Sequence, residues 1–277
     1  ALPDIDTEDE VRQLRDSFET MQGSLQEYID DLKTTTAANE RFESELTIAS
    51  NIQMAMLPKE FPNNEEFDLY AMLKPAKEVG GDLYDFFVRN DILYFVIGDV
   101  SGKGIPAAMV MATAKCSFRF SAHYEKDPQD IVTGMNKALS ANNDSEMFVT
   151  LFAGMLDLKT GLLRYCNAGH NPVLVNGEYL KVKPNLALGL FREFAYQQQE
   201  IQLQAGSSIT LYTDGITEAE RADKAQFGEE ALKQCTLQAK DMSAEQTCRH
   251  IISQVQAFTK GNVQNDDITI MTIKINR

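Results

Sequence analysis

Residues 98–109 read GDVSGKGIPAAM, and the prediction of the fold starts from this stretch. The six residues before it, 92–97 (ILYFVI), are apolar and partly β-branched or aromatic, which is typical of a buried strand. Pro106 then opens an Ala- and Met-rich segment, as proline does in the first turn of a helix. We therefore expect Asp99 at the end of a buried strand beside glycine-rich backbone. Such a place suits a site that holds a metal ion or a phosphate.

Composition limits the possible partners of the chain. Its 277 residues, 43% of them hydrophobic, predict one large domain with an extension, or two domains. The net charge of −15 argues against nucleic acid or an anionic membrane surface as the main partner. Four cysteines without CxxC spacing favour a reduced, cytoplasmic setting. No apolar run approaches the roughly 20 residues of a membrane span. Without a signal peptide or an initial methionine, the chain is expected to be a fragment that makes no membrane contact.

The first 60 residues carry a heptad pattern. Apolar residues recur at alternating steps of three and four along one seam: Val11, Leu14, Phe18, Met21, Leu25, Tyr28 and Leu32. This a/d pattern predicts a coiled-coil helix over residues 11–56, and with it a homodimer. The seam becomes polar at Thr35 and Asn39. A second apolar stripe (Ile48, Ile52, Met56) could contact the following domain.

From Asp68 onward the pattern changes to short strands and inserted helices. Strands are predicted at 67–75, 82–89, 91–99, 147–157, 161–167, 172–176, 178–183, 193–203, 207–213 and 267–275. Helices are predicted at 105–123, 128–141, 228–239 and 243–259. Hairpin turns such as Asn176-Gly177, with helices inserted in blocks, predict an α+β fold of antiparallel sheets covered by helices.

Several site chemistries fit the sequence poorly. The SGKG run lacks the spacing and the final Ser/Thr of a phosphate-binding loop. GGDLYD at 80–85 differs from the GGDEF signature of nucleotide cyclases in its acidic residues. A Ser or Cys nucleophile has little support, since only His170 of the three histidines falls in a turn-like stretch. Cysteines and histidines also lack zinc-site spacing.

Aspartates at strand ends remain as the candidate chemistry. They are Asp82, Asp99, Asp214 and the pair Asp266-Asp267. Any one Asp-Gly or Gly-Asp pair can be an ordinary turn. Four acidic places at strand ends together favour a site of hard oxygen ligands. Such ligands suit two Mn²⁺ or Mg²⁺ ions, which could activate water and neutralise a phosphate without a protein nucleophile.

At these residues the chain resembles the metal-dependent protein phosphatase (PPM) family, in its bacterial SpoIIE/RsbU branch. The matches are GGDLYDFF, GDVSGKGIPAA, NAGHNP, YTDGITEA and NDDIT, in the family's order over 46–277. The resemblance implies an αββα sandwich that hydrolyses phosphoserine or phosphothreonine with two metal ions. It implies that Asp82, Asp99, Asp214, Asp266 and the Val100 carbonyl form the metal shell. Asp267 is the weaker candidate of its pair, and Ser101 replaces a histidine of eukaryotic relatives, so no general acid is assigned.

Two further resemblances concern the N-terminal part. Residues 1–32 resemble the second half of a HAMP domain at Pro3, Asp9-Glu10-Val11, Leu14, Phe18 and Met21. The segment 40–62 resembles the helix that controls the catalytic domain in the SpoIIE/RsbU branch. We expect a HAMP part at 1–32, a coiled-coil linker and regulatory helix at 33–62, and a phosphatase domain at 63–277. The resemblances imply a phosphorylated STAS-type regulator as substrate, and an inner-membrane anchor in a longer protein. The alternative function is a catalytically inactive signalling scaffold.

Overall fold

The computed structural model describes residues 10–62, 64–141, 143 and 146–276. The chain divides into two compact units, Ala1–Ala49 and Ser50–Arg277. Residues 50–62, which the sequence assigns to the linker and regulatory helix, therefore belong to the second unit. No helix in the described part of the chain has the length and apolar character needed to cross a membrane.

The helix α1 (Glu10–Met56) runs through the predicted heptad region without interruption. Its seam side chains are largely exposed, with Leu14 at 69%, Leu25 at 56% and Leu32 at 53%. Thr35 and Asn39 lie within the helix, so the polar part of the seam does not break it. Of the residues that resemble a HAMP domain, Pro3 and Asp9 lie outside the described residues.

Two five-stranded antiparallel sheets form the centre of the second unit. One sheet has the order β1-β10-β9-β6-β7, and the other β2-β3-β4-β5-β8. The strands of the first sheet are β1 (Phe67–Lys74), β10 (Ile268–Ile275), β9 (Ser208–Tyr212), β6 (Leu174–Val175) and β7 (Glu178–Tyr179). Those of the second are β2 (Leu83–Arg89), β3 (Ile92–Val100), β4 (Val149–Asp157), β5 (Leu162–Ala168) and β8 (Gln199–Gln202).

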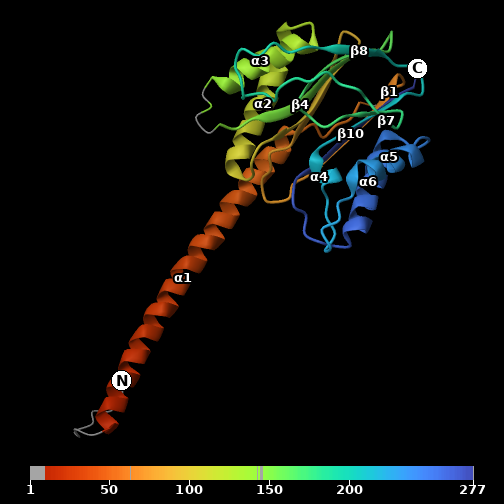
Figure 1. The fold of residues 1–277 in the computed structure, drawn as a ribbon. Helices are drawn as coiled ribbons and strands as arrows, with labels where there is room; N and C mark the ends of the chain where they lie inside the picture. Colours follow the sequence, from red (N-terminus) through yellow and green to blue (C-terminus); the bar gives the residue numbers. More distant parts are fainter. Residues whose placement is uncertain (1–9, 63, 142, 144–145, 277) are drawn as a thin grey trace. The chain divides into compact units, whose positions relative to one another are not determined.

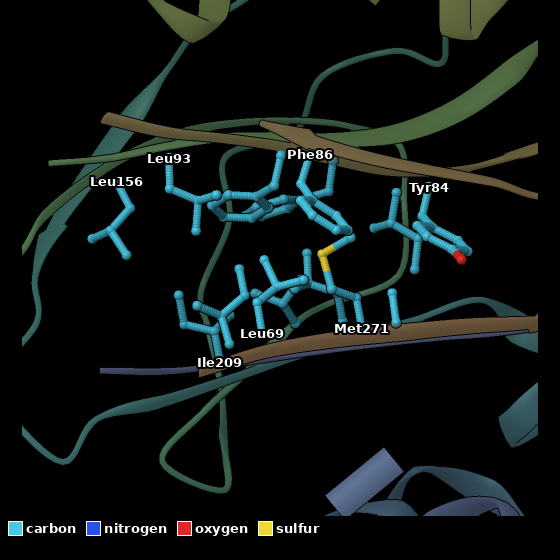
Figure 2. Close-up of a cluster of buried hydrophobic side chains, with 14 of the residues drawn as sticks. Leu69, Tyr84, Phe86, Leu93, Leu156, Ile209 and Met271 are labelled. Atoms are coloured by element: carbon cyan, nitrogen blue, oxygen red, sulfur yellow. The ribbon is translucent and has the colours of Figure 1, made fainter. Parts of the chain in front are cut away.

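Apolar side chains from both sheets meet in a shared core (Figure 2). Tyr84, Phe86, Leu93 and Leu156 point from one sheet toward Leu69, Ile209 and Met271 of the other. Two further clusters lie on the outer faces of the sheets, beneath the helices. Because both faces of β3 are covered, its sequence is a continuous apolar run instead of an alternating pattern.

Helices cover the outer face of each sheet (Figure 1). On the second sheet lie α2 (Ile105–Tyr124) and α3 (Pro128–Ser140), which contribute Met111, Phe118 and Ile131 to the core. On the first sheet lie α5 (Gly228–Gln238) and α6 (Ala244–Thr259), with Leu232 and Ile251 facing inward. The predicted αββα sandwich, preceded by a long helix, is therefore confirmed.

Most predicted elements agree with the structure to within a few residues. The Asn176-Gly177 hairpin forms between β6 and β7, with positive φ at both turn residues (52° and 79°). The strand predicted at 193–203 is shorter, because β8 pairs with β5 only over Gln199–Gln202. Residues before it instead send Phe194 and Tyr196 into the core beneath α2 and α3. The sequence prediction omitted the short helix α4 (Asp214–Thr217).

Candidate active site

Asp82 and Asp99 lie side by side on neighbouring strands. Asp82 directly precedes β2, and Asp99 is the penultimate residue of β3. Leu83 pairs with Gly98 in the antiparallel register, which brings the two aspartates to the same end of the sheet. The pairing of β2 with β3 therefore places the two aspartates next to each other at this end of the sheet.

The opposite sheet holds the Asp82 carboxylate in place. The Thr213 hydroxyl, just after β9, donates a hydrogen bond to Asp82 Oδ2 at 2.7 Å. The Thr269 hydroxyl, in β10, donates to the same oxygen at 2.5 Å. Thr213 Oγ1 also accepts from the Thr269 backbone N–H at 3.0 Å. Asp82 is 2% exposed, so these bonds join the two sheets in a buried place at one end of the sandwich.

Asp214 and Asp266 come to the same end of the sandwich from the first sheet. Asp214 begins α4 two residues after the end of β9, and Asp266 precedes β10 by two residues. The two turns touch closely at Gly215, where a Cβ would lie 2.0 Å from the Asp267 carbonyl oxygen. Only glycine permits this approach, which explains the Asp-Gly pair in YTDG.

The carboxylates at this end raise one another's pKa. Burial raises the pKa of Asp99 to about 7, and the charges of Asp214 and Asp266 add to the effect. Burial raises the pKa of Asp82 well above its usual range, followed by the charge of Asp99. The pKa of Asp214 is raised by burial and then by Glu218. The site therefore holds more negative charge than its surroundings compensate.

Asp267 has a different environment from Asp266. Its Oδ1 accepts from the Ala76 backbone N–H at 2.8 Å, and its Oδ2 from that of Gly81 at 2.7 Å. A Cβ on Gly80 would lie 2.0 Å from Asp267 Oδ2, so this packing requires glycine at position 80. Both carboxylate oxygens thus hold the 76–82 loop that carries Asp82. This geometry favours Asp266 over Asp267 as a metal ligand.

The last turns of α1 are attached to the same loop. Gln53, 6% exposed, donates its side-chain N–H to the Gly80 carbonyl at 2.6 Å. Its Oε1 accepts from the Gly80 N–H at 3.1 Å. Met54 and Leu57 pack against the core, whereas Ile52 is 61% exposed. Gln53, Met54 and Leu57 therefore contact the phosphatase unit, whereas Ile48 and Ile52 of the second apolar stripe are exposed.

The positively charged side chain of Lys103 lies next to Asp266. Lys103 Nζ lies 2.7 Å from Asp266 Oδ2 and donates to the Asn265 carbonyl at 2.6 Å. Both side chains line a cavity of about 330 Å³, which Gly215, Glu218 and Val263 also border. Lys103 belongs to the SGKG run that we rejected as a phosphate-binding loop.

The remaining positions of the motifs have mainly structural contacts. The Ser101 hydroxyl accepts from the Phe148 N–H at 2.9 Å, and the Ser101 N–H donates to the Phe148 carbonyl at 2.9 Å. Val100 is 1% exposed, and its carbonyl oxygen packs against Gly81. Asp85, the second acid of GGDLYD, is fully buried and binds Lys115 and Arg119 of α2. Asp85 therefore attaches α2 to β2 and takes no part in the carboxylate group.

The donor set fits a hard divalent cation. Carboxylate oxygens are the ligands that Mg²⁺ and Mn²⁺ prefer, and the uncompensated charge of Asp82, Asp99 and Asp214 would be relieved by a cation. Within the described residues, no three His, Cys, Asp or Glu side chains are already arranged as a metal-binding group. Asp82, Asp99, Asp214 and Asp266 are the residues that would hold the ions.

Sequence reasoning missed four contributors to this site: Thr213, Thr269, Lys103 and Gln53. Thr213 and Thr269 stand inside the motifs YTDG and NDDIT, as hydroxyls at the ends of buried strands. Such a hydroxyl needs a buried partner, which was an available signal. Gln53 binds the backbone of Gly80, and Lys103 binds the Asp266 carboxylate and the Asn265 carbonyl. These partners are far away in the sequence, so only the fold identifies them.

Comparison with known proteins identifies the family. A model of the family described as "Stage II sporulation protein E (SpoIIE)" matches residues 90–276. The chain belongs to this SpoIIE family of PP2C-type, or PPM, serine/threonine phosphatases. The resemblance seen in the sequence is thereby confirmed for the phosphatase part.

Individual relatives agree with this assignment. Phosphoserine phosphatase RsbU of Bacillus subtilis is 28% identical, over 87% of this chain and 73% of RsbU. Protein IcfG of Synechocystis is 31% identical, over 83% of this chain and 41% of IcfG, so the chain spans less than half of that relative.

Solved structures share the fold. The SiaA-PP2C domain of Pseudomonas aeruginosa superposes with a TM-score of 0.76 at 21% identity, covering 86% of this chain and 99% of that domain. The RsbU and RsbW domains of Rv1364c from Mycobacterium tuberculosis give a TM-score of 0.64 at 24% identity, covering 76% of this chain and 60% of that one.

Proposed function

We propose that this chain is a metal-dependent phosphatase that hydrolyses phosphoserine on a partner signalling protein. The observation that carries the proposal is the convergence of Asp82, Asp99 and Asp214 from two sheets at one end of the sandwich. Their raised pKa values indicate a site that lacks a positive charge. Two Mn²⁺ or Mg²⁺ ions would supply an activated water and charge neutralisation for the phosphoryl group.

The residues of the chain have distinct tasks in this proposal. The Thr213 and Thr269 hydroxyls orient Asp82 and act to lower its pKa, whereas burial and the charge of Asp99 keep that pKa raised, so a bound cation would be needed to favour the charged form. Asp99, Asp214 and Asp266 complete the ligand set, and the Val100 carbonyl lies beside Gly81. Asp267 positions the loop that carries Asp82.

The partners are proposed on the same basis. The relative RsbU is named a phosphoserine phosphatase, and Rv1364c carries RsbU and RsbW domains in one structure. These relatives and the sequence resemblance support a phosphorylated STAS-type regulator as substrate. The exposed seam of α1 supports a homodimer, with a HAMP segment at 1–32 that connects it to a membrane anchor in a longer protein.

The test is hydrolysis of p-nitrophenyl phosphate by the 277-residue chain, with Mn²⁺ and with EDTA. Turnover should require the metal and be restored after EDTA by excess Mn²⁺. Asp99→Asn and Asp214→Asn should each lower turnover by at least about 100-fold, because each removes a ligand charge at nearly constant volume. Their melting temperatures should not fall, since less like charge remains in the site. Metal-independent turnover would contradict the metal-dependent mechanism, and no turnover at all in the wild type would favour the scaffold.

A further inference from the structure

We propose that Lys103 is a built-in cation that competes with a metal ion for the Asp266 carboxylate. Metal binding at Asp266 then requires the lysine ammonium group to leave. This inference rests on the proposed function, because it concerns the same carboxylates. It adds a residue that tunes the metal affinity of the site.

The contact geometry supports competition. Lys103 Nζ lies 2.7 Å from Asp266 Oδ2, which is the distance of a direct charged hydrogen bond. A second bond to the Asn265 carbonyl, at 2.6 Å, fixes the ammonium group beside the turn that carries Asp266. The ammonium group therefore lies against the Asp266 carboxylate oxygen that a metal ion would need.

The loop around Lys103 is built to present this side chain. Gly102 and Gly104 have φ values of +87° and +79°, a region that other residues rarely adopt. One glycine with positive φ therefore lies on each side of Lys103, in the loop that connects β3 to α2. At 43% exposed, the side chain is not locked in the interior. A lysine on a flexible four-carbon stem can therefore move to solvent when a metal ion arrives.

Lys74 provides a matched control for a general charge effect. It lines the same cavity of about 330 Å³, and among the described residues it makes no ion pair. Removing the Lys74 charge alters the local potential but breaks no contact with a candidate ligand. Lys103→Arg is a second control, because it retains the charge and the ability to bind Asp266.

The first experiment measures Mn²⁺ binding to the whole 277-residue chain from the EPR signal of free Mn²⁺. For Lys103→Gln we expect the dissociation constant to fall roughly two- to five-fold, the effect of removing one partly exposed ion pair. Lys74→Gln and Lys103→Arg should keep the wild-type value. An unchanged or weaker constant for Lys103→Gln, or equal tightening by Lys74→Gln, would overturn the inference.

The second experiment needs no variant. Lysine amines of the wild type are labelled by reductive methylation, with and without Mn²⁺, and quantified by mass spectrometry. Mn²⁺ should increase the labelling rate of Lys103 relative to Lys74, because an ammonium group released from Asp266 is more accessible. An unchanged or lower rate for Lys103 would show that it stays in place, which contradicts competition. Metal binding without turnover would refute the proposed function alone, whereas no metal binding would refute both.

Discussion

His170, the one histidine that the sequence places in a turn-like stretch, is a structural residue in the fold. It is 5% exposed, and its Nδ1 lies 3.1 Å from the Thr150 hydroxyl. Asn167 holds its backbone on both sides, accepting from the His170 N–H at 2.7 Å and donating to its carbonyl at 3.0 Å. Burial lowers the pKa of His170 to about 4, so the ring is neutral at physiological pH. The NAGHNP motif therefore builds a turn next to Thr150, whose strand partner is Asp99.

This burial predicts a pH dependence of stability. The ordinary pKa of 6.5 applies to the unfolded chain, and the folded value is about 4. Between these values the unfolded state binds more protons, so stability is complete above pH 6.5 and is lost as pH falls toward 4. The full effect is about 3 kcal/mol, at about 1.4 kcal/mol per pKa unit.

The measurement is urea unfolding of the wild type and His170→Gln, each at several pH values between 7 and 4. The difference between the two proteins isolates His170, because the aspartates titrate in both. We expect the advantage of the wild type to shrink as the pH falls. A constant difference across the range would show that His170 is not forced to remain neutral.

At the scale of elements, the end of α1 and the loop carrying Asp82 form one connected segment. Gln53 binds both polar atoms of the Gly80 backbone, and Asp267 binds the N–H of Gly81. Asp82 follows directly. A change in the position of Gln53 therefore acts on a candidate metal ligand within two residues. This connection supports the regulatory helix that the resemblance implies at 33–62.

Gln53→Ala should reduce phosphatase turnover at limiting Mn²⁺ by roughly ten-fold, and less at saturating Mn²⁺. The unfolding free energy should fall by about 1–3 kcal/mol, because the buried Gly80 N–H and carbonyl lose their partners. Ile52→Ala is the matched control, since this neighbour is 61% exposed and should change neither quantity. Equal activity in Gln53→Ala and the wild type at every metal concentration would exclude the connection.

At the scale of the whole molecule, the exposed apolar seam of α1 is a surface that a second helix could cover. Leu14, Met21, Leu25 and Leu32 are each more than half exposed along one side of the helix. A single helix with such a seam is stabilised when a second copy covers it. Since each phosphatase unit follows its helix in the sequence, we expect a parallel dimer.

Deleting residues 1–45 should therefore weaken dimerisation. The measurement is sedimentation equilibrium of the full chain and of the shortened chain over a range of concentrations. The shortened chain should dissociate at a much higher concentration than the full chain. If both proteins remain dimers to the same extent, the interface lies in residues 46–277.

The polar seam positions predict a second property of the dimer. Thr35 and Asn39 interrupt the apolar contacts between Leu32 and Phe42, and polar seam residues lower coiled-coil stability while fixing register. Thr35→Leu combined with Asn39→Ile should raise the melting temperature. If this weak segment lets the helix change register for signalling, turnover should also change several-fold. Greater stability with unchanged turnover would mean that the two residues affect packing alone.

The sequence by itself determined the class of fold and most of the element boundaries. The heptad seam, the apolar runs and the turn residues act through local conformation and periodicity, which a single sequence contains. Thus Asn176-Gly177 predicted its hairpin, and Pro106 predicted the start of α2. The four aspartates could be selected because each stands near the end of a predicted strand, three of them directly beside a glycine.

Tertiary structure alone decided which side chains face the candidate metal site and which hold the surrounding loops in place. The resemblance ranked Asp266 above Asp267 as a ligand, but only the fold shows the other role of Asp267, which binds the amides of Ala76 and Gly81, about 190 residues away. The same is true of Gln53 at Gly80, of the two threonines at Asp82 and of Lys103 at Asp266. These contacts join different sheets, loops and helices, and their geometry depends on the packing of the sandwich. The local sequence does not specify that packing. The same type of side chain can bind a metal ion or hold a loop, depending on which atoms the tertiary fold places beside it.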